Sequence, residues 1–185
     1  MTERLDVVRT TPRFSGRVFN VRSDDVRYED GTVHTLDVVE HRGSFAIIAT
    51  APDDRLVLVR QYRHPAGRYL WEIPAGTAEP GEDPRDGALR ELAEESGYRA
   101  AQIRDLGALY VTPGFCTEVL HFFHAWDLTP GEQNTDDDER IEVATVTLAE
   151  AKRLLASGEI ADVKTALSVA WLEGPRTEIS GMPGR

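Results

Sequence analysis

Three glutamates in the middle of the chain are the residues whose types and spacing best suit chemistry. Within GTAEPGEDPRDGALRELAEESGY, which runs from Gly76 to Tyr98, Glu91, Glu94 and Glu95 stand at i, i+3 and i+4. A helix would bring their carboxylates to one side, where two of them about 6 Å apart repel by roughly 3 kcal/mol. A hard divalent cation such as Mg²⁺ or Mn²⁺ would offset this repulsion. The alternative, from charge alone, is an ordinary solvated acidic helix.

The sequence predicts a helix that would position these glutamates. Asp83 suits the N-cap, Pro84 the first helical position and Gly97 the position after the C-terminus. Arg90 is offset so that it can pair with Glu94 or with Glu82 from the preceding loop. The apolar residues on the opposite side are expected to pack on a sheet, and they are Leu89, Leu92 and Ala93.

The full spacing of the segment is more specific than its charge. From Gly76 it reads Gly, five residues, Glu82, seven residues, Arg-Glu-Leu, one residue, Glu-Glu, one residue, Gly-Tyr. Seven fixed identities at roughly 6% each occur by chance about once in 10⁸–10⁹ start positions. The segment resembles the Nudix box of the Nudix hydrolase superfamily. Its one departure is Tyr98, where an aliphatic residue is usual.

The flanking segments narrow the resemblance. VVEHRGSFAII, RQYRHPAGRYLWEIPAG and YVTPGF, with Pro113 fifteen residues beyond Tyr98, are similar to the ADP-ribose pyrophosphatase branch. The similarity covers roughly residues 15–172. It implies a hydrolase that uses a divalent metal to cut a nucleoside diphosphate linked to another group.

Carried over residue by residue, the resemblance implies a metal site and a brace beside it. The implied metal ligands are the side chains of Glu91, Glu94 and Glu95 and the backbone carbonyl of Ala75. Glu82 and Arg90 would orient these ligands. The expected cofactor is Mg²⁺, with Mn²⁺ as a substitute.

The resemblance also implies residues that bind the substrate. Arg63, in QYR, matches a position that contacts phosphates in similar enzymes, and a guanidinium suits a pair of diphosphate oxygens. Glu118, in TPGFCTE, is a further candidate. Arg17 and Asp37 are candidate adenine contacts, the first by stacking and the second by accepting from the exocyclic amine. For each of these residues, a surface position without a role is the alternative.

The acidic loop Asp136-Asp137-Asp138-Glu139 contains two candidates for the general base. In similar enzymes this loop carries a glutamate four residues before the isoleucine that begins the next strand. Counted from Ile141, that position is Asp137, whereas the glutamate of this loop is Glu139. The longer side chain favours Glu139, and the choice stays open. A solvated acidic turn is the alternative for the whole run.

Composition excludes several classes of protein. The chain has 185 residues with 32 Asp+Glu against 21 Lys+Arg, a net charge of −11, which argues against binding to a phosphate backbone. No basic run favours a membrane surface, and no apolar stretch of about 18 residues predicts a membrane span. MTERLDVVRT lacks the apolar core of a signal peptide. Cys116 is the single cysteine, which fits a cytoplasmic protein, and the resemblance implies a small-molecule nucleoside diphosphate as the partner.

The order of the predicted elements indicates the fold class. A β-hairpin is expected over residues 17–42, with its turn at EDGT, and strands around 45–49, 56–62, 71–73, 104–111, 119–126 and 141–146. Thr147 with Glu150 predicts a second helix, and Asp162 caps a third. We therefore expect an α/β fold, a Nudix-type α/β/α sandwich with a mixed β-sheet, preceded by a small N-terminal antiparallel β-hairpin subdomain. The expected division is 1–43, 44–174 and a tail at 175–185.

The resemblance implies the activity and the assembly. The expected reaction is Mg²⁺-dependent hydrolysis of ADP-ribose to AMP and ribose 5-phosphate, in a homodimer that exchanges its N-terminal sheets. One alternative is the same chemistry on a GDP- or UDP-sugar. A different class of protein, a sensor that binds ADP-ribose without hydrolysing it, is disfavoured because the box is complete.

Overall fold

The computed structural model describes residues 5–134 and 140–174, which form two compact units. The N-terminal unit comprises residues up to Gly43 together with Leu109–Leu120. The α/β unit comprises Ser44–Ala108 and the residues from His121 onward. The segment Leu109–Leu120 thus groups with the N-terminal sheet although it lies inside the predicted second domain.

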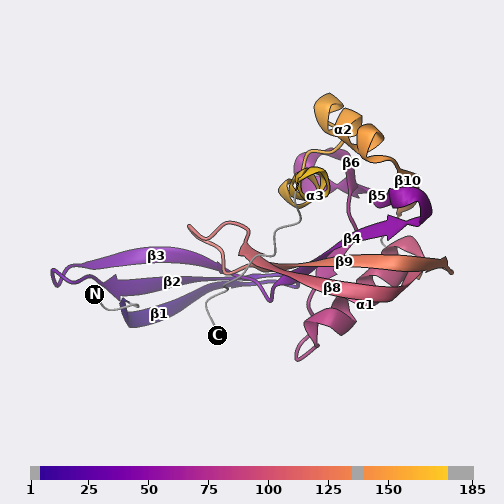
Figure 1. Cartoon of the computed structure of the whole chain (residues 1–185). Helices are drawn as coiled ribbons and strands as arrows, with labels where there is room; N and C mark the ends of the chain where they lie inside the picture. Colours follow the sequence, from indigo (N-terminus) through magenta and orange to yellow (C-terminus); the bar gives the residue numbers. More distant parts are fainter. Residues whose placement is uncertain (1–4, 135–139, 175–185) are drawn as a thin grey trace. The chain divides into compact units, whose positions relative to one another are not determined.

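The N-terminal unit contains a three-stranded antiparallel sheet in the order β1-β2-β3 (Figure 1). Its strands are β1 (Asp6–Ser15), β2 (Asn20–Arg27) and β3 (Val33–Glu40). The predicted hairpin is β2–β3, and its turn is closed by a bond from the Tyr28 N–H to the Thr32 carbonyl (2.9 Å). The sequence did not predict β1, which extends the hairpin to a three-stranded sheet.

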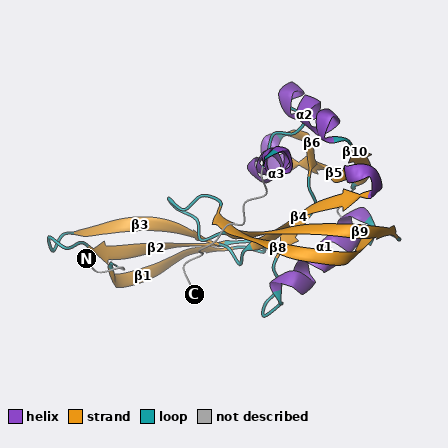
Figure 2. Cartoon of the chain, in the orientation of Figure 1, coloured by secondary structure: helices purple, strands orange, loops and turns teal. Residues whose placement is uncertain are grey.

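The α/β unit is built on a seven-stranded sheet in the order β10-β5-β4-β9-β8, with β6 paired to β5 and β7 paired to β4 (Figure 2). Its strands are β4 (Ser44–Ala51), β5 (Arg55–Arg63), β6 (Arg68–Glu72), β7 (Ala75–Thr77), β8 (Tyr98–Tyr110), β9 (Val119–Pro130) and β10 (Glu142–Val146). β7 was not predicted, because three residues carry no recognisable pattern. It matters for the site because it leads into the glutamate helix.

Three helices begin at the predicted caps. They are α1 (Pro84–Ser96), α2 (Leu148–Ser157) and α3 (Val163–Glu173). The Asp83 carboxylate accepts from the Arg85 and Asp86 N–H groups, Thr147 and Glu150 form a complete capping box, and Asp162 accepts from the Thr165 N–H. These side chains satisfy backbone donors that a helix N-terminus leaves unpaired.

The helices cover both faces of the sheet, as Figure 1 shows for α1 and α3. On one face, Ala88 and Leu92 of α1 pack in a buried cluster with Phe123 of β9. On the other face, Phe122 packs edge-on against Trp171 of α3, with ring centroids 5.0 Å apart. Neighbouring residues of a strand point to opposite faces, so α1 and α3 lie on opposite sides. The predicted α/β sandwich is confirmed.

The buried side of α1 is rotated from the predicted one. Ala88, Leu92 and Glu95 are buried, whereas Leu89 is half-buried. The reason is that Glu95 finds hydrogen-bond partners beneath the helix, so a carboxylate occupies part of the inward face. Among the described residues, no helix is long and apolar enough to cross a membrane.

Candidate active site

A close approach between β7 and α1 places the first glutamate of the predicted metal site. A Cβ built on Gly76 would lie 2.0 Å from the Cδ atom of Glu91 and 2.1 Å from both of its carboxylate oxygens. Real Cβ atoms do not approach other atoms this closely, so only glycine leaves room for the carboxylate. The first residue of the box therefore shapes the space that Glu91 occupies.

Glu95 joins the same helix to the first residue of β7. It is 4% exposed, and its Oε2 atom accepts a hydrogen bond from the Ala75 N–H (2.8 Å). Gln61 of β5 approaches the other carboxylate oxygen at 3.4 Å. These contacts hold Glu95 beside Ala75, so two of the predicted metal-site residues are neighbours.

Arg90 contacts both partners that the sequence predicted for it. Its Nε and Nη2 atoms donate to the two carboxylate oxygens of Glu82, at 2.8 and 3.0 Å. Its Nη1 atom donates to Glu91 (3.0 Å) and to Glu94 (2.9 Å). The hydrogen bonds from Arg90 hold the pKa of Glu82 below its usual range, and those to Glu82 raise the pKa of Arg90. The guanidinium thus braces three carboxylates.

The donor set of this cluster suits a hard divalent cation. Glu91 and Glu94 both reach one nitrogen, Arg90 Nη1, so their carboxylates converge. Three carboxylates, those of Glu82, Glu91 and Glu94, contact one guanidinium, which leaves an excess of negative charge. Oxygen ligands with excess negative charge are what Mg²⁺ binds in proteins. Among the residues that the structure describes, no group of three or more His, Cys, Asp or Glu side chains is already arranged around a metal position.

The end of α1 is fixed by the segment that follows β9. Gln133 Nε2 donates to the Glu95 carbonyl (2.7 Å), and the Asn134 N–H donates to the Glu94 carbonyl (3.1 Å). These bonds satisfy carbonyls that a helix C-terminus leaves unpaired. Gly97 has a φ of 73°, and a Cβ there would lie 2.9 Å from the Gly131 carbonyl oxygen. Both candidate bases, Asp137 and Glu139, lie outside the described residues, and the choice between them stays a prediction.

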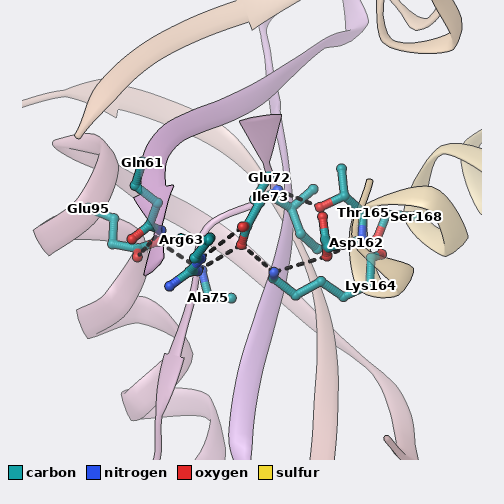
Figure 3. Close-up of polar contacts among 10 residues, drawn as sticks. All are labelled: Gln61, Arg63, Glu72, Ile73, Ala75, Glu95, Asp162, Lys164, Thr165 and Ser168. Atoms are coloured by element: carbon teal, nitrogen blue, oxygen red, sulfur yellow. Dashed lines mark hydrogen bonds and ion pairs between the residues drawn. The ribbon is translucent and has the colours of Figure 1, made fainter. Parts of the chain in front are cut away.

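Arg63, the predicted phosphate contact, is paired with a buried carboxylate. Its Nε and Nη2 atoms donate to Glu72 at 2.8 and 2.7 Å. Figure 3 shows the guanidinium between Glu72 and Glu95. The hydrogen bonds to Glu72 raise the pKa of Arg63, and the negative charge of Glu95 raises it further by a smaller amount. Sequence reasoning missed Glu72 and its second partner Lys164. The fragment WEIPAG contains Glu72, but nothing local indicates a partner in α3.

The three other predicted substrate contacts belong to the N-terminal unit, whereas Arg63 and the helix glutamates belong to the α/β unit. Arg17 is exposed and lines a pocket of about 200 Å³ with Phe19, His41 and Arg42. Asp37 accepts a hydrogen bond from the Ser23 hydroxyl (2.6 Å). A carboxylate oxygen of Glu118 lies 3.8 Å from Nδ1 of His41. Their roles stay predictions.

Comparison with known proteins places these features in a family context. The model of the NUDIX domain matches residues 40–167. An ADP-ribose pyrophosphatase of Bacillus subtilis (strain 168) is 40% identical over 162 residues, which are 86% of this chain and 88% of the relative. A methanol dehydrogenase activator of Bacillus methanolicus is 39% identical over 168 residues, 90% of this chain and 91% of the relative.

A solved structure shows the same fold. The crystal structure of an ADP compounds hydrolase superposes with a TM-score of 0.79 at 24% identity, covering 95% of this chain and 98% of that one. The mixed α/β architecture with an N-terminal antiparallel sheet is therefore shared with a known hydrolase.

Proposed function

We propose that this chain, which belongs to the Nudix family and is a Nudix pyrophosphohydrolase, has ADP-ribose as its substrate. Water would attack one phosphorus of the diphosphate and lose a proton, and the bond from that phosphorus to the bridging oxygen would break. The bridging oxygen would leave with the other phosphate. The products are AMP and ribose 5-phosphate. The observation that carries the proposal is the 40% identity to the Bacillus subtilis ADP-ribose pyrophosphatase over most of both chains.

We propose that Glu91, Glu94, Glu95 and the carbonyl of Ala75 hold Mg²⁺, for which Mn²⁺ can substitute. When bound, such a cation neutralises charge on the diphosphate and makes a water molecule more acidic. The convergence of Glu91 and Glu94 on one nitrogen of Arg90 supports this ligand set. The Glu95 carboxylate, tied to the Ala75 N–H, fixes the helix against the strand that carries the carbonyl.

The chain's own residues supply binding and orientation. Arg90, held on both oxygens of Glu82, keeps Glu91 and Glu94 in place before substrate arrives. Arg63 would bind the diphosphate through the edge of its guanidinium that Glu72 does not use. Glu139 or Asp137 would accept the proton of the attacking water, and Arg17, Asp37 and Glu118 would contact the rest of the substrate.

We also propose that the chain acts as a homodimer through its N-terminal sheet. Several apolar side chains of this sheet are exposed, among them Val7 (51%), Phe14 (55%), Val33 (46%) and Leu36 (42%). Val33 and Leu36 stand three residues apart on β3 and so point to opposite faces, which means that apolar side chains are exposed on both faces of the sheet. Exposed apolar side chains on both faces favour an interaction surface. Light scattering at micromolar concentration should give the mass of two chains, and the mass of one chain would refute the dimer.

The reaction is tested by incubating the protein with ADP-ribose and Mg²⁺ in ¹⁸O-labelled water and weighing the products. AMP and ribose 5-phosphate are expected, with the label on the product whose phosphorus is attacked. If ADP-ribose stays intact while a GDP- or UDP-sugar is hydrolysed, the substrate is that nucleotide sugar and not ADP-ribose. Binding of ADP-ribose without turnover of any of these compounds would favour the sensor.

The variant Glu94→Gln separates the metal site from the fold. Glu94 is 36% exposed at its side chain, so the substitution should leave the unfolding temperature within a few degrees of the wild type. Turnover should fall by at least about 10³-fold, because one charged metal ligand is lost. A folded and fully active Glu94→Gln variant would rule out the proposed ligand set.

A further inference from the structure

A charged carboxylate lies almost completely buried at the end of β6. Glu72 is 1% exposed, and burying an ionised group without partners costs several kcal/mol. Its partners are Arg63, which donates from Nε and Nη2, and Lys164 of α3, which donates from Nζ (Figure 3). Burial disfavours the charged form of Glu72, but these donors outweigh it and hold its pKa below the usual range.

The pairing with Glu72 uses one edge of the Arg63 guanidinium. The group is planar, so two bonds through Nε and Nη2 fix both its position and its orientation. Neither bond uses Nη1, which lies on the far side of the group from Glu72. The Arg63 side chain is 38% exposed although its partner is buried, so part of the guanidinium is open to solvent.

The orientation of Arg63 matters because of what lies next to it. Figure 3 shows Glu95 on the side of Arg63 opposite to Glu72, with Ala75 close by. Ala75 and Glu95 are joined by a hydrogen bond of 2.8 Å and belong to the proposed metal site. An arginine held here stands beside the place where the diphosphate would lie.

Lys164 holds Glu72 from a second side. Oε2 of Glu72 accepts from both Arg63 and Lys164. Because Lys164 is a residue of α3, its bond to Glu72 ties the carboxylate to that helix. Lys164 also donates to Asp162 (3.0 Å), whose side chain caps α3.

We propose that Glu72 is a positioning residue for substrate binding: it holds Arg63 by its Nε–Nη2 edge so that the Nη1 edge is presented to the diphosphate, and Lys164 secures Glu72 to α3. The inference rests on the proposed function only in that Arg63 binds the diphosphate. Glu72 acts through Arg63 and does not touch the substrate.

The test is a double-mutant cycle with Glu72→Gln, Arg63→Ala and the double variant. Two quantities are measured: KM and kcat for ADP-ribose with Mg²⁺, and Kd for ADP-ribose in EDTA by calorimetry. Glu72→Gln should raise KM and Kd by roughly 10- to 100-fold, the effect of losing one charge-assisted bond to the substrate, with a smaller change in kcat. In the Arg63→Ala background, Glu72→Gln should change both values less than twofold.

A matched control breaks the ion pair of another arginine on β5. Arg60 lies on the same strand as Arg63 and pairs with Glu142 of β10, so Glu142→Gln should leave KM and Kd unchanged. If Glu72→Gln does not fold, Lys164→Met takes its place in the cycle. Lys164→Met loosens Glu72 but leaves the ion pair between Glu72 and Arg63. This variant should raise KM roughly 3- to 10-fold, again only when Arg63 is present.

Three results would overturn the inference. An equal rise in KM with and without Arg63 would show that Glu72 does not act through Arg63. A fall in KM on Glu72→Gln would show that Glu72 competes with substrate for Arg63. A loss of folded protein at unchanged KM would show a structural role alone. Because Kd in EDTA does not require turnover, coupled binding in a protein that fails to hydrolyse ADP-ribose would refute the proposed function and keep the inference.

Discussion

Replacing Arg90 with methionine removes the guanidinium that contacts three carboxylates of the glutamate cluster. Arg90 makes four hydrogen bonds to the carboxylates of Glu82, Glu91 and Glu94. A hydrogen bond to a charged group contributes about 1.5–3 kcal/mol, and two carboxylates about 6 Å apart repel by roughly 3 kcal/mol. The Arg90 side chain is 26% exposed, so water recovers part of this loss.

We expect Arg90→Met to lower the free energy of unfolding by about 3 kcal/mol, which for a chain of this length lowers Tm by roughly 6–12 °C. The measurement is thermal and urea unfolding at pH 7 without divalent cations. Arg153→Met is the control, because Arg153 is 71% exposed and its ion pair with Glu150 is a surface contact on α2. That control should change stability by less than about 1 kcal/mol.

The pH dependence gives a second, independent measure of the same effect. Hydrogen bonds from Arg90 lower the pKa of Glu82 from its ordinary value of 4.5. A lowered carboxylate pKa stabilises the fold above the unfolded pKa, and this contribution is lost as pH falls through the folded pKa. The difference between wild type and Arg90→Met should therefore be full at pH 7 and shrink below about pH 4. A difference under about 0.5 kcal/mol at pH 7, or one that grows on acidification, would refute the reasoning.

Two further substitutions test the close approach at Gly76 and the anchoring of Lys164. Gly76→Ala places a Cβ 2.0 Å from the Glu91 carboxyl carbon, so kcat should fall at least about tenfold. The control is Gly114→Ala, where a Cβ meets nothing within 4 Å and kcat should not change. Asp162→Ala removes a helix N-cap and should cost about 1 kcal/mol, as should Thr147→Ala in α2. If Asp162 anchors Lys164, only Asp162→Ala should also raise KM; equal KM values in the two cap variants would contradict this.

The sequence predicts the elements whose signals are local. Asp83, Pro84 and Gly97 delimit α1 because an N-cap, a first-turn proline and a left-handed terminal residue act within one turn of the helix. The pairing of Arg90 with Glu82 and Glu94 is predictable for the same reason, since helical spacing brings them together. The Nudix fold followed from the complete box.

Features that depend on distant partners were missed. β1 is almost wholly exposed and contains Pro12, beside a register shift in its pairing with β2, so its own residues give little strand signal. The inward position of Glu95 depends on Gln61 and on the Ala75 N–H, which no helical pattern reveals. Leu89 and Ala93, which were predicted on the buried side together with Leu92, are half-buried.

The contacts around Glu72 also set the order in which the site can be completed during synthesis. Arg90 and Glu82 are 8 residues apart, so the brace of the glutamate helix can form as soon as that segment has left the ribosome. Lys164 and Glu72 are 92 residues apart, as are Thr165 and Ile73, whose N–H donates to the Thr165 hydroxyl. The buried carboxylate of Glu72 therefore gains its full set of donors only when α3 docks. A chain that ends before α3 keeps the glutamates of the Nudix box but leaves Glu72 without its lysine.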